Sequence, residues 1–573
     1  MPNKNNTKKS EKIDKTVKIM ALGGLDEDGK NMLVVEAGDD IFIIEAGLKF
    51  PAGNKESLGI EYIIQDFSWL QQRADKVKAI FITHGHDDVM GALPHLLRVV
   101  KADVYTPPLA AREIARKLKK EKITGVHLHK ITRHDTKRIA GRKISFFPVT
   151  HAYPGAYGLA ISTTQGYVVY SGEFIENFDD LDEHYRGNIT ICSKLGQEGV
   201  LVLMQESKGA ERNGHTSPAH RIAPTLTDTF TQYTDRRIFI SIYTQSVYMI
   251  QEILETCEKL QRKLVLYDKE LRRLVDGLEE IGIHVPRNLI VPLDQIGTSP
   301  NCVVLISGQG KPLFKQLSNI ANNEVDDIKF DSHDVIVIAS PVVPGVETEY
   351  KSMENDIYKR GGILKVIDHK KVLSMHASKE DLKMMIFMCR PKYYLPVKGE
   401  YRMLCANALI AEEMGIPADH IHVLDNGQQA VFEDGQLVSL KMEAELHDTL
   451  IDGKENWDMA GVVLKDREIL STDGVMVLAI GLDAKTKKII NGPDIQTRGF
   501  IYLKDAEYIT QECAKIMEET IADNLANHKY ENLQTRSDIR DKVSKYLFKQ
   551  TGKRPMVLPV ILEISGKRNE HAR

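Results

Sequence analysis

One short segment limits the possible fold more than any other part of the sequence. The apolar run 78–83 leads directly into His84-Gly-His86-Asp-Asp88, and a helical pattern follows. An apolar run of this length before turn residues is typical of a buried strand. Two histidines two residues apart at a strand end point to the same side, and Gly85 allows a sharp turn. The segment therefore predicts a strand–loop–helix unit with imidazole and carboxylate groups on its loop.

Nitrogen and oxygen groups that converge on one loop are ligands that zinc accepts. The HxH pair alone carries little weight, because a chain with 19 histidines contains about one such pair by chance. Two further pairs, His127/His129 and His420/His422, lie in alternating apolar runs, and we interpret them as ordinary strand residues. Asp88 and the strand–loop–helix context make the first pair the candidate metal site.

Composition excludes several classes of protein. Hydrophobic residues make up 42% and charged residues 27%, and the net charge is −4. These values exclude a mostly disordered chain and a strongly basic nucleic-acid wrapper, but not a local basic groove. The six cysteines have no CxxC spacing, which fits a reducing cytoplasm. Neither a secretory signal nor an 18-residue apolar span is found, so we expect a cytoplasmic protein that does not cross a membrane.

The pattern of apolar runs predicts one domain inserted into another. Residues 17–214 mix short strands with helical stretches such as 57–77 and 109–122, which is typical of a layered α/β domain. Residues 215–365 alternate helical patterns with apolar runs, the βαβα rhythm of a parallel sheet. The first pattern returns in residues 366–446. The insertion therefore lies between the two parts of the first domain.

The two ends of the chain differ from this central region. Residues 1–16 are polar and lysine-rich, and we expect a disordered basic tail. Residues 447–457 are interpreted as a linker. Residues 458–573 contain strand runs and a long helical pattern, which predict a small separate α+β domain.

Many segments resemble, in the same order, those of the ribonuclease J family, which are β-CASP nucleases of the metallo-β-lactamase superfamily. THGHDDVMGALP (83–94) resembles the HxHxDH loop of that superfamily. The other matching segments include GGLDEDGKNM (23–32), VTHAYPGAYGLAI (149–161), VVYSGEF (168–174), LMQESKGAERNG (203–214), YLPVKGEYRM (394–403) and GPDIQTRGFIY (492–502). The resemblance implies a metallo-β-lactamase αββα sandwich, a β-CASP domain at 215–365 and a C-terminal domain that contributes to subunit association.

The resemblance also implies a function. Ribonuclease J proteins are two-zinc phosphodiesterases that cut RNA internally and also degrade it from a 5′-monophosphate end, in RNA maturation and decay. The implied cofactor is zinc, and the implied partners are RNA and a second copy or a paralogous subunit. A true β-lactamase is disfavoured, because the inserted and C-terminal domains imply a large polymeric substrate.

By this resemblance, four residues match the ligands of the first metal site: His84, His86, His151 and Glu173. Three nitrogens and one oxygen are an acceptable tetrahedral zinc set. Glu173 stands where the family has a bridging aspartate, and glutamate is one methylene longer. Glu45 and Glu206 occupy two supporting acidic positions of the family.

The second metal site departs from the family pattern. Asp88 is present, but Val89 replaces the histidine after it, and Lys398 replaces a histidine from a later segment. Only Asp88 and Glu173 remain of four expected ligands, and an ammonium group repels a dication. We therefore expect one zinc site at most. These losses resemble those of the second, degenerate paralogue of the family.

The phosphate-binding segment of the family is altered as well. It reads VLSMH (372–376), and Ser374, Met375 and His376 are the expected substrate-binding residues. Asp88 and His376 are the expected catalytic residues.

Two functions stay open from the sequence. The first is a weak or partner-dependent metal ribonuclease, which the intact His84, His86, Asp88 and His151 favour. The second is a catalytically silent structural subunit that binds RNA and supports an active paralogue, which Val89 and Lys398 favour. We hypothesise that Lys398 pairs with Asp88 and Glu173, because buried carboxylates without a counter-ion are costly. The alternative is a solvated lysine at a widened pocket.

Overall fold

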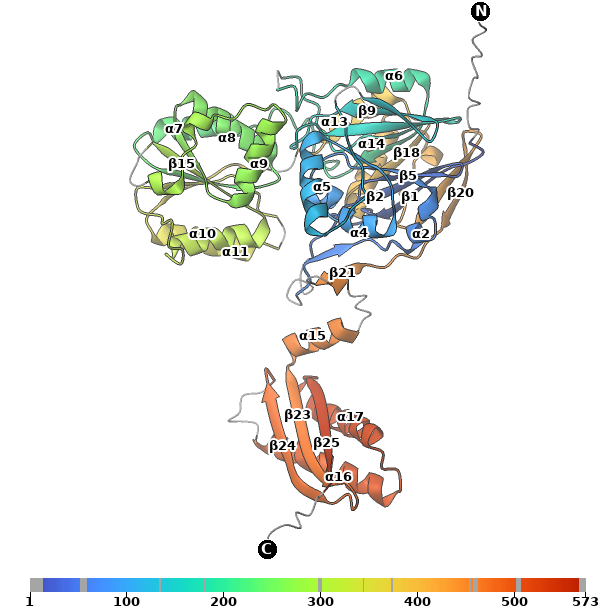
Figure 1. Cartoon of the computed structure of the whole chain (residues 1–573), viewed down its shortest axis with the longest axis vertical. Helices are drawn as coiled ribbons and strands as arrows, with labels where there is room; N and C mark the ends of the chain where they lie inside the picture. Colours follow the sequence, from blue (N-terminus) through green and yellow to red (C-terminus); the bar gives the residue numbers. More distant parts are fainter. Residues whose placement is uncertain are drawn as a thin grey trace, which may run out of the picture. The chain divides into compact units, whose positions relative to one another are not determined.

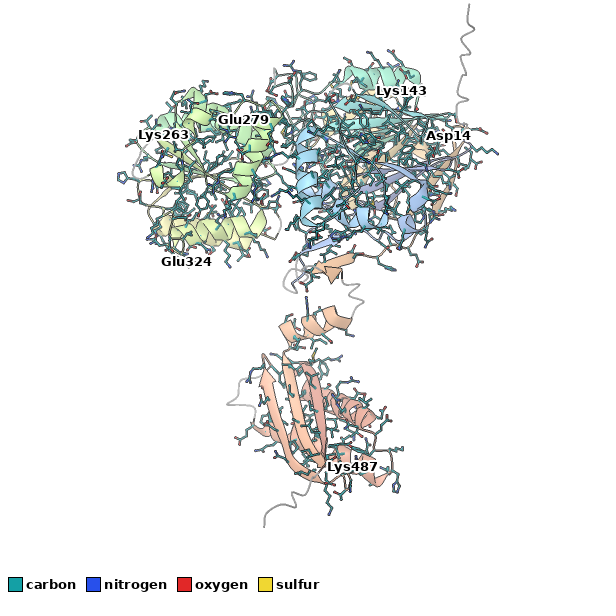
Figure 2. All side chains as sticks on the ribbon, viewed as in Figure 1. Asp14, Lys143, Lys263, Glu279, Glu324 and Lys487 are labelled. Carbon is teal, nitrogen blue, oxygen red and sulfur yellow. The ribbon has the colours of Figure 1, made fainter. Side chains whose placement is uncertain are left out.

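A computed structural model describes most of the chain. The described residues are 14–51, 59–132, 135–179, 182–296, 301–343, 345–372, 375–452, 455–456, 462–500 and 507–565. The chain divides into two compact units, one of Met1–Phe50 and Tyr62–Thr449 and one of Pro51–Glu61 and Leu450–Arg573. Most of the expected tail lies outside the described residues. Asp14, labelled in Figure 2, is the first described residue; it is buried and pairs with Arg142 at 2.5 Å.

The first unit contains an eight-stranded sheet in the order β20-β19-β1-β2-β3-β5-β6-β7 (Figure 1). Its strands are β1 (Val17–Gly23), β2 (Met32–Ala37), β3 (Asp40–Ile44), β5 (Val77–Phe81), β6 (Val104–Thr106), β7 (Leu128–Lys130), β19 (Gln428–Glu433) and β20 (Gln436–Met442). The strands from β20 to β3 pair antiparallel, and those from β3 to β7 pair parallel. The residues of β2 and β3 are all buried, so the sheet is covered on both faces.

A six-stranded sheet faces the first one. Its order is β18-β12-β11-β10-β9-β8, with β8 (Thr136–Ile139), β9 (Arg142–Pro148), β10 (Tyr157–Thr163), β11 (Gly166–Tyr170), β12 (Val200–Glu206) and β18 (Tyr393–Val397). Phe42 and Phe81 of one sheet share a core with Phe146 and Tyr170 of the other. This shared core joins the two sheets face to face.

Helices cover the outer faces of both sheets. On the first sheet lie α2 (Ser68–Gln71), α3 (Asp87–Met90), α4 (Leu93–Val99) and α5 (Pro108–Lys120). On the second lie α6 (Thr190–Glu198), α13 (Lys379–Cys389) and α14 (Tyr401–Glu413). The result is the expected αββα sandwich.

The helix predicted at 57–77 is wrong. The described part of this segment contains β4 (Tyr62–Ile64), the short α2 and a 3-10 turn at Ala74–Lys76. Ile63 exchanges two backbone hydrogen bonds with Lys49, at 2.8 and 2.9 Å. This tertiary strand pairing replaces the helix that the local pattern favoured.

The inserted region forms a five-stranded sheet that is parallel throughout. Its order is β14-β15-β13-β16-β17, with β13 (Ile238–Tyr243), β14 (Lys263–Leu266), β15 (Cys302–Gly308), β16 (Val335–Ile338) and β17 (Ile363–Val366). One face packs on α7 (Ala223–Gln232), α8 (Val247–Lys259) and α9 (Lys269–Glu280), and the other on α10 (Gly310–Ala321) and α11 (Glu347–Lys359). Leu109 and Ala110 of α5 belong to the first of these cores. The inserted sheet is thus joined to the sandwich by apolar contact.

The second unit contains a three-stranded sheet in the order β24-β23-β25. The strands are β23 (Val475–Asp483), β24 (Ile489–Arg498) and β25 (Met556–Ile564), and the helices are α15 (Val462–Thr472), α16 (Glu507–Ala526) and α17 (Asn532–Thr551). The buried residues of β23 form one core with those of α16 and α17. Leu558, Leu562 and Ile564 point to the opposite face and are exposed. One face of the sheet is therefore covered by helices and the other carries exposed apolar side chains.

The segment 447–457 contains β21 (Thr449–Asp452) and β22 (Glu455–Asn456), a short antiparallel pair. The domain boundaries given from the sequence stay predictions. Among the described helices, none combines the length and the apolar character needed to cross a membrane.

Candidate metal centre

The loops after three strands bring together four potential ligands. His84 and His86 follow β5, His151 follows β9, and Glu173 follows β11. Each offers one nitrogen or oxygen atom, and these atoms all lie within 4.8 Å of one another. All four residues are buried. The cluster forms because β5 and the other two strands belong to facing sheets, whose strand ends meet at one edge of the sandwich.

Two of the imidazoles are oriented by bonds on their outer sides. Nδ1 of His84 lies 3.0 Å from the Thr83 hydroxyl, and Nδ1 of His151 lies 2.9 Å from the Met375 carbonyl. Among the described residues, Nε2 of either histidine has no hydrogen-bond partner. These atoms instead lie 3.5 and 3.6 Å from the carboxylate of Glu173. A buried nitrogen without a partner, held from behind by a second group, is typical of a metal ligand.

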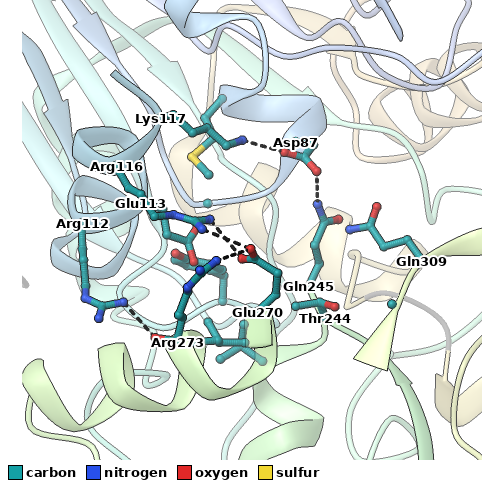
Figure 3. A pocket seen from close by; sticks show the side chains of 16 residues that line it. Asp87, Arg112, Glu113, Arg116, Lys117, Thr244, Gln245, Glu270, Arg273 and Gln309 are labelled. Carbon is teal, nitrogen blue, oxygen red and sulfur yellow. Dashed lines mark hydrogen bonds and ion pairs between the residues drawn. The ribbon is translucent and has the colours of Figure 1, made fainter. Parts of the chain in front are cut away.

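His86 is held from the inserted domain. Its Nε2 lies 3.1 Å from the carbonyl oxygen of Gln245, which follows β13, so Nδ1 is the nitrogen left for a ligand. The Gln245 amide also donates to Asp87 at 3.0 Å, and Lys117 of α5 donates to the same carboxylate at 2.9 Å (Figure 3). These bonds join the histidine loop to the β13–α8 turn.

The three imidazoles are neutral at physiological pH. Burial lowers the pKa of His84 and His151 well below the usual value, and neighbouring histidines lower it further. Burial lowers the pKa of His86 to about 4. Neutral imidazole is the form that binds a metal. The donor set therefore fits one zinc ion.

Beside these candidate ligands, the ammonium groups of two lysines lie against buried carboxylates. Nζ of Lys398 lies 2.9 Å from Oδ2 of Asp88 and forms an ion pair with Oε1 of Glu173. A second lysine, Lys208, lies 3.7 Å from Asp88 and pairs with Asp28 at 2.5 Å. Burial alone would raise the pKa of Asp88, but the two ammonium groups outweigh burial and hold it well below its usual range. The ion pairs that we hypothesised for Lys398 are present.

Local structure directs Lys398 into this position. Its φ is 58°, in the left-handed region, which costs a non-glycine residue about 1 kcal/mol. Its carbonyl accepts a hydrogen bond from the Ser207 amide at 3.1 Å. The side chain of Val89, in contrast, is fully buried in the apolar core that α3 covers and offers no polar atom.

His376 lies at the edge of the cluster. Its Nδ1 is 2.5 Å from Oε2 of Glu206 and 3.4 Å from Glu173. Glu206 also accepts backbone hydrogen bonds from Phe174 and Ala377. Glu206 therefore fixes His376 to the loop that carries Glu173.

The other candidates that the structure describes are not part of the ligand cluster. Met375 is buried in the core, and Ser374 lies outside the described residues. His129 pairs with Asp103 at 2.9 Å. His420 lies in a 3-10 turn, so our interpretation of His420 as a strand residue is wrong. Neither histidine belongs to the cluster.

Two residues of the site were missed from the sequence. Lys208 lies two residues after β12, in a segment that resembles the family. Lysine, however, is not a residue type that normally binds a metal. Gln245 acts largely through its backbone carbonyl, which any residue has. Neither has a side-chain signal that identifies it without the fold.

A cavity of about 630 Å³ lies next to the histidine loop, between α5 and α9 (Figure 3). Ion pairs cross between the two helices. Arg112 pairs with Glu280 at 2.8 Å, and Arg116 pairs with Glu270 at 3.1 Å. The cavity is therefore lined by cations and carboxylates from both the sandwich and the inserted domain.

Comparison with known proteins identifies family models along most of the chain. The matches are a beta-lactamase superfamily domain (58–193), a ribonuclease J beta-CASP domain (235–357), a Zn-dependent metallo-hydrolase RNA specificity domain (365–422) and a ribonuclease J C-terminal domain (462–564). His84, His86, His151 and Glu173 fall in the first of these.

Similar proteins are found over nearly the full length. Ribonuclease J 2 of Staphylococcus aureus (strain NCTC 8325 / PS 47) is 33% identical over 560 residues, covering 96% of this chain and 99% of the relative. Ribonuclease J 2 of Staphylococcus saprophyticus is 31% identical over the same shares. A crystal structure of a protein of unknown function from Enterococcus faecalis V583 has a TM-score of 0.50 at 17% identity, covering 73% of this chain and 100% of that one. This last likeness concerns the fold alone.

Proposed function

The chain belongs to the ribonuclease J family, and from this premise we propose that it is a metal-dependent ribonuclease of low intrinsic activity. It would hydrolyse RNA phosphodiester bonds from the 5′ end and internally, in cytoplasmic RNA processing and decay. The observation that carries this proposal is the set of three neutral imidazoles and one carboxylate within 4.8 Å. Buried polar groups in this number are costly without a bound ligand.

The proposed first site uses His84, His86, His151 and Glu173. A zinc ion held there supplies Lewis-acid activation of water and of the phosphate. Glu206 accepts the Nδ1–H of His376, so Nε2 of His376 is left to accept a proton from a reacting group or, when the ring carries a second proton, to donate it to a phosphate or leaving oxygen. The ammonium groups of Lys398 and Lys208, which lie beside Asp88, would attract the negatively charged phosphate. Ser374 and Met375 stay predicted substrate contacts.

Low activity is proposed because the second site lacks ligands. Two-metal phosphodiesterases stabilise the attacking and leaving oxygens with separate ions. Here Lys398 pairs with both remaining carboxylates, Asp88 and Glu173. A lysine carries one positive charge and offers no open coordination position. One zinc at most would therefore bind, and RNA hydrolysis would be slower than in a two-metal phosphodiesterase.

The same ion pairs favour the second candidate, a silent structural subunit. In that case the lysines would replace the metals as structural charges, and the chain would bind RNA beside an active paralogue. For either function we propose association with a second copy or a paralogue through the open face of the β24-β23-β25 sheet. Leu562 and Ile564 on this face are 56% and 45% exposed, which is typical of a surface that a partner covers.

The two candidates are separated by degradation of a 5′-monophosphorylated RNA. The purified chain is compared with its His84→Ala/His86→Ala variant at the same salt and zinc concentration. Degradation by the wild type alone would identify an enzyme. Equal inactivity would support the structural subunit. Equal activity would mean that the rate comes from another site or a contaminant, and the metal assignment would then carry no function.

A further inference from the structure

A groove in the second unit, separate from the metal centre, carries an arrangement of cations that the proposed chemistry does not use. It has a volume of about 900 Å³ and lies between α17, the end of α15 and the edge strand β25. We call it the α17 groove. One side of α17 lines it with Arg536, Arg540, Ser544 and Phe548. These residues are four apart, so successive side chains lie about 6 Å further along the helix axis.

The α17 groove is positively charged. Arg536, Arg540, Lys545 and Arg554 line it, and Asp466 is the one carboxylate among the lining residues. Arg540 has an exposed ion pair with Asp541 at 3.3 Å and donates a hydrogen bond to the Ser537 hydroxyl at 3.0 Å. In the described part of the chain, no ion pair is found for the other three cations. Positive charge without local neutralisation, on a chain whose net charge is −4, marks a local attraction for a polyanion.

The groove also offers an aromatic surface. Phe548 is 46% exposed, and the guanidinium of Arg554 lies 4.3 Å from the centre of its ring. Leu533 of α17 also lines the groove and is 71% exposed. A paired base of a duplex has no free face for such a ring, whereas an unpaired base stacks on it. Three arginines further favour phosphate, because guanidinium binds two oxygens at once.

We propose that the α17 groove binds a short segment of single-stranded RNA. Phosphates would lie along Arg536, Arg540 and Lys545, and one base would stack on Phe548 beside Arg554. The proposal rests on the proposed function only in taking RNA as the ligand. It assigns the C-terminal unit an RNA contact of its own in addition to its proposed role in association.

The test uses the full-length protein and a single-stranded 12-nucleotide RNA that carries 2′-O-methyl groups against cleavage and one 4-thiouridine. Crosslinked peptides are identified by mass spectrometry, and affinity is measured by fluorescence anisotropy. We expect crosslinks in residues 533–559. They should fall at least five-fold in Arg540→Ala/Lys545→Ala and in Phe548→Ala. The matched control Lys542→Ala/Lys549→Ala removes the same charge from α17 outside the groove lining and should leave the crosslinks unchanged.

Salt dependence gives a second measure. Loss of two phosphate contacts should reduce the slope of log affinity against log salt by about 1.4 for single-stranded RNA. Thermal unfolding of each variant establishes that it is folded.

Three outcomes would overturn the proposal. Crosslinks confined to residues 14–449 would leave the proposed function intact and reject the groove. Stronger competition by polyglutamate than by unlabelled RNA would assign the groove to an acidic protein segment. An equal effect of the control variant would show non-specific charge attraction. Crosslinks in 533–559 alone would support the groove and count against the proposed RNA site in the first unit.

Discussion

At the scale of single residues, Lys398 has the largest effect on the candidate site. Its side chain is 2% exposed and that of Glu173 is 1% exposed, so neither charge is well solvated. Removal of two charges from water is costly, and only close pairing offsets it. Lys208 adds a second ammonium group near Asp88. The carboxylates that would hold a dication are thereby neutralised by the chain itself.

Removal of the Lys398 ammonium group provides the first prediction. Lys398→Ala leaves Glu173 as a buried charge without its counter-ion, and we expect a loss of about 3 kcal/mol in the free energy of unfolding, or a gain in bound zinc. Urea denaturation and elemental analysis measure the two quantities. The control is Lys18→Ala, which breaks the partly exposed ion pair with Glu36 and should cost less than about 1 kcal/mol. If stability and zinc content both stay unchanged, Lys398 has no charge-compensating role.

A buried acid three residues after Glu173 provides a prediction on pH. Burial, with a contribution from Asp381, raises the pKa of Glu176 to about 8. The folded state then keeps a proton that the unfolded state releases above pH 4.5. Stability from this group is fully present below pH 4.5 and is lost as the pH rises to 8, by about 5 kcal/mol at most. We expect Glu176→Gln to be more stable than the wild type at pH 8 and similar to it at pH 5.

Urea denaturation at pH 5, 6.5 and 8 measures this difference. The control Glu121→Gln changes an acid that is 43% exposed and should keep the wild-type pH dependence. A wild type and Glu176→Gln that respond equally to pH would show that Glu176 titrates normally.

At the scale of elements, the contact between α5 and α9 sets the position of the inserted domain. The ion pairs Arg112–Glu280 and Arg116–Glu270 are partly exposed, so each contributes less than about 1 kcal/mol. Leu109 is fully buried and belongs to the core of the inserted domain. Apolar contact therefore holds the two helices together, and the ion pairs line the cavity beside it.

Close approach of the two helices depends on Gly277 of α9. A Cβ atom at this position would lie 2.7 Å from Cδ1 of Leu109. Gly277→Ala normally stabilises a helix by about 0.5–1 kcal/mol, but here we expect a net loss of about 1–3 kcal/mol from overpacking. Denaturant unfolding measures whether Gly277→Ala raises or lowers the free energy of unfolding. The control Glu279→Ala changes an exposed residue on the same helix and should have little effect. A more stable Gly277→Ala would mean that α5 and α9 can separate without cost.

Sequence patterns predicted most of these elements, but not all of the site. The run before His84 is β5, as its continuous apolar character predicted, and the stretch at 109–122 contains α5, as its helical pattern predicted. The segment around Ile63 was misassigned because its pairing with Lys49 is tertiary. Lys208 and Gln245 reach the site through the fold and through a backbone carbonyl, which no local pattern encodes. The proximity of Lys398 to Asp88 followed from the family resemblance, not from spacing.

At the scale of the whole molecule, the two units carry different chemical surfaces. The first unit collects buried histidines and carboxylates at one edge of the sandwich. The second has a helix-covered sheet with one open apolar face and a cationic groove beside α17. If the metal site is weakened as proposed, the second unit is the part of the chain suited to binding another subunit. The open face therefore decides whether the proposed partner role is correct.

The addition of charge to the open face of the β24-β23-β25 sheet gives the last prediction. Leu562 and Ile564 alternate with the buried Ile561 on β25, so Leu562→Glu/Ile564→Glu adds two charges to the open face without entering the core. If the face is an interface, the buried charges would oppose association, and we expect at least a ten-fold weaker self-association or paralogue binding by sedimentation velocity. The control Glu518→Lys/Glu519→Lys changes exposed acids on α16, the opposite side of the sheet, and should leave association unchanged. Wild-type association by the Leu562→Glu/Ile564→Glu protein would place the subunit contact elsewhere.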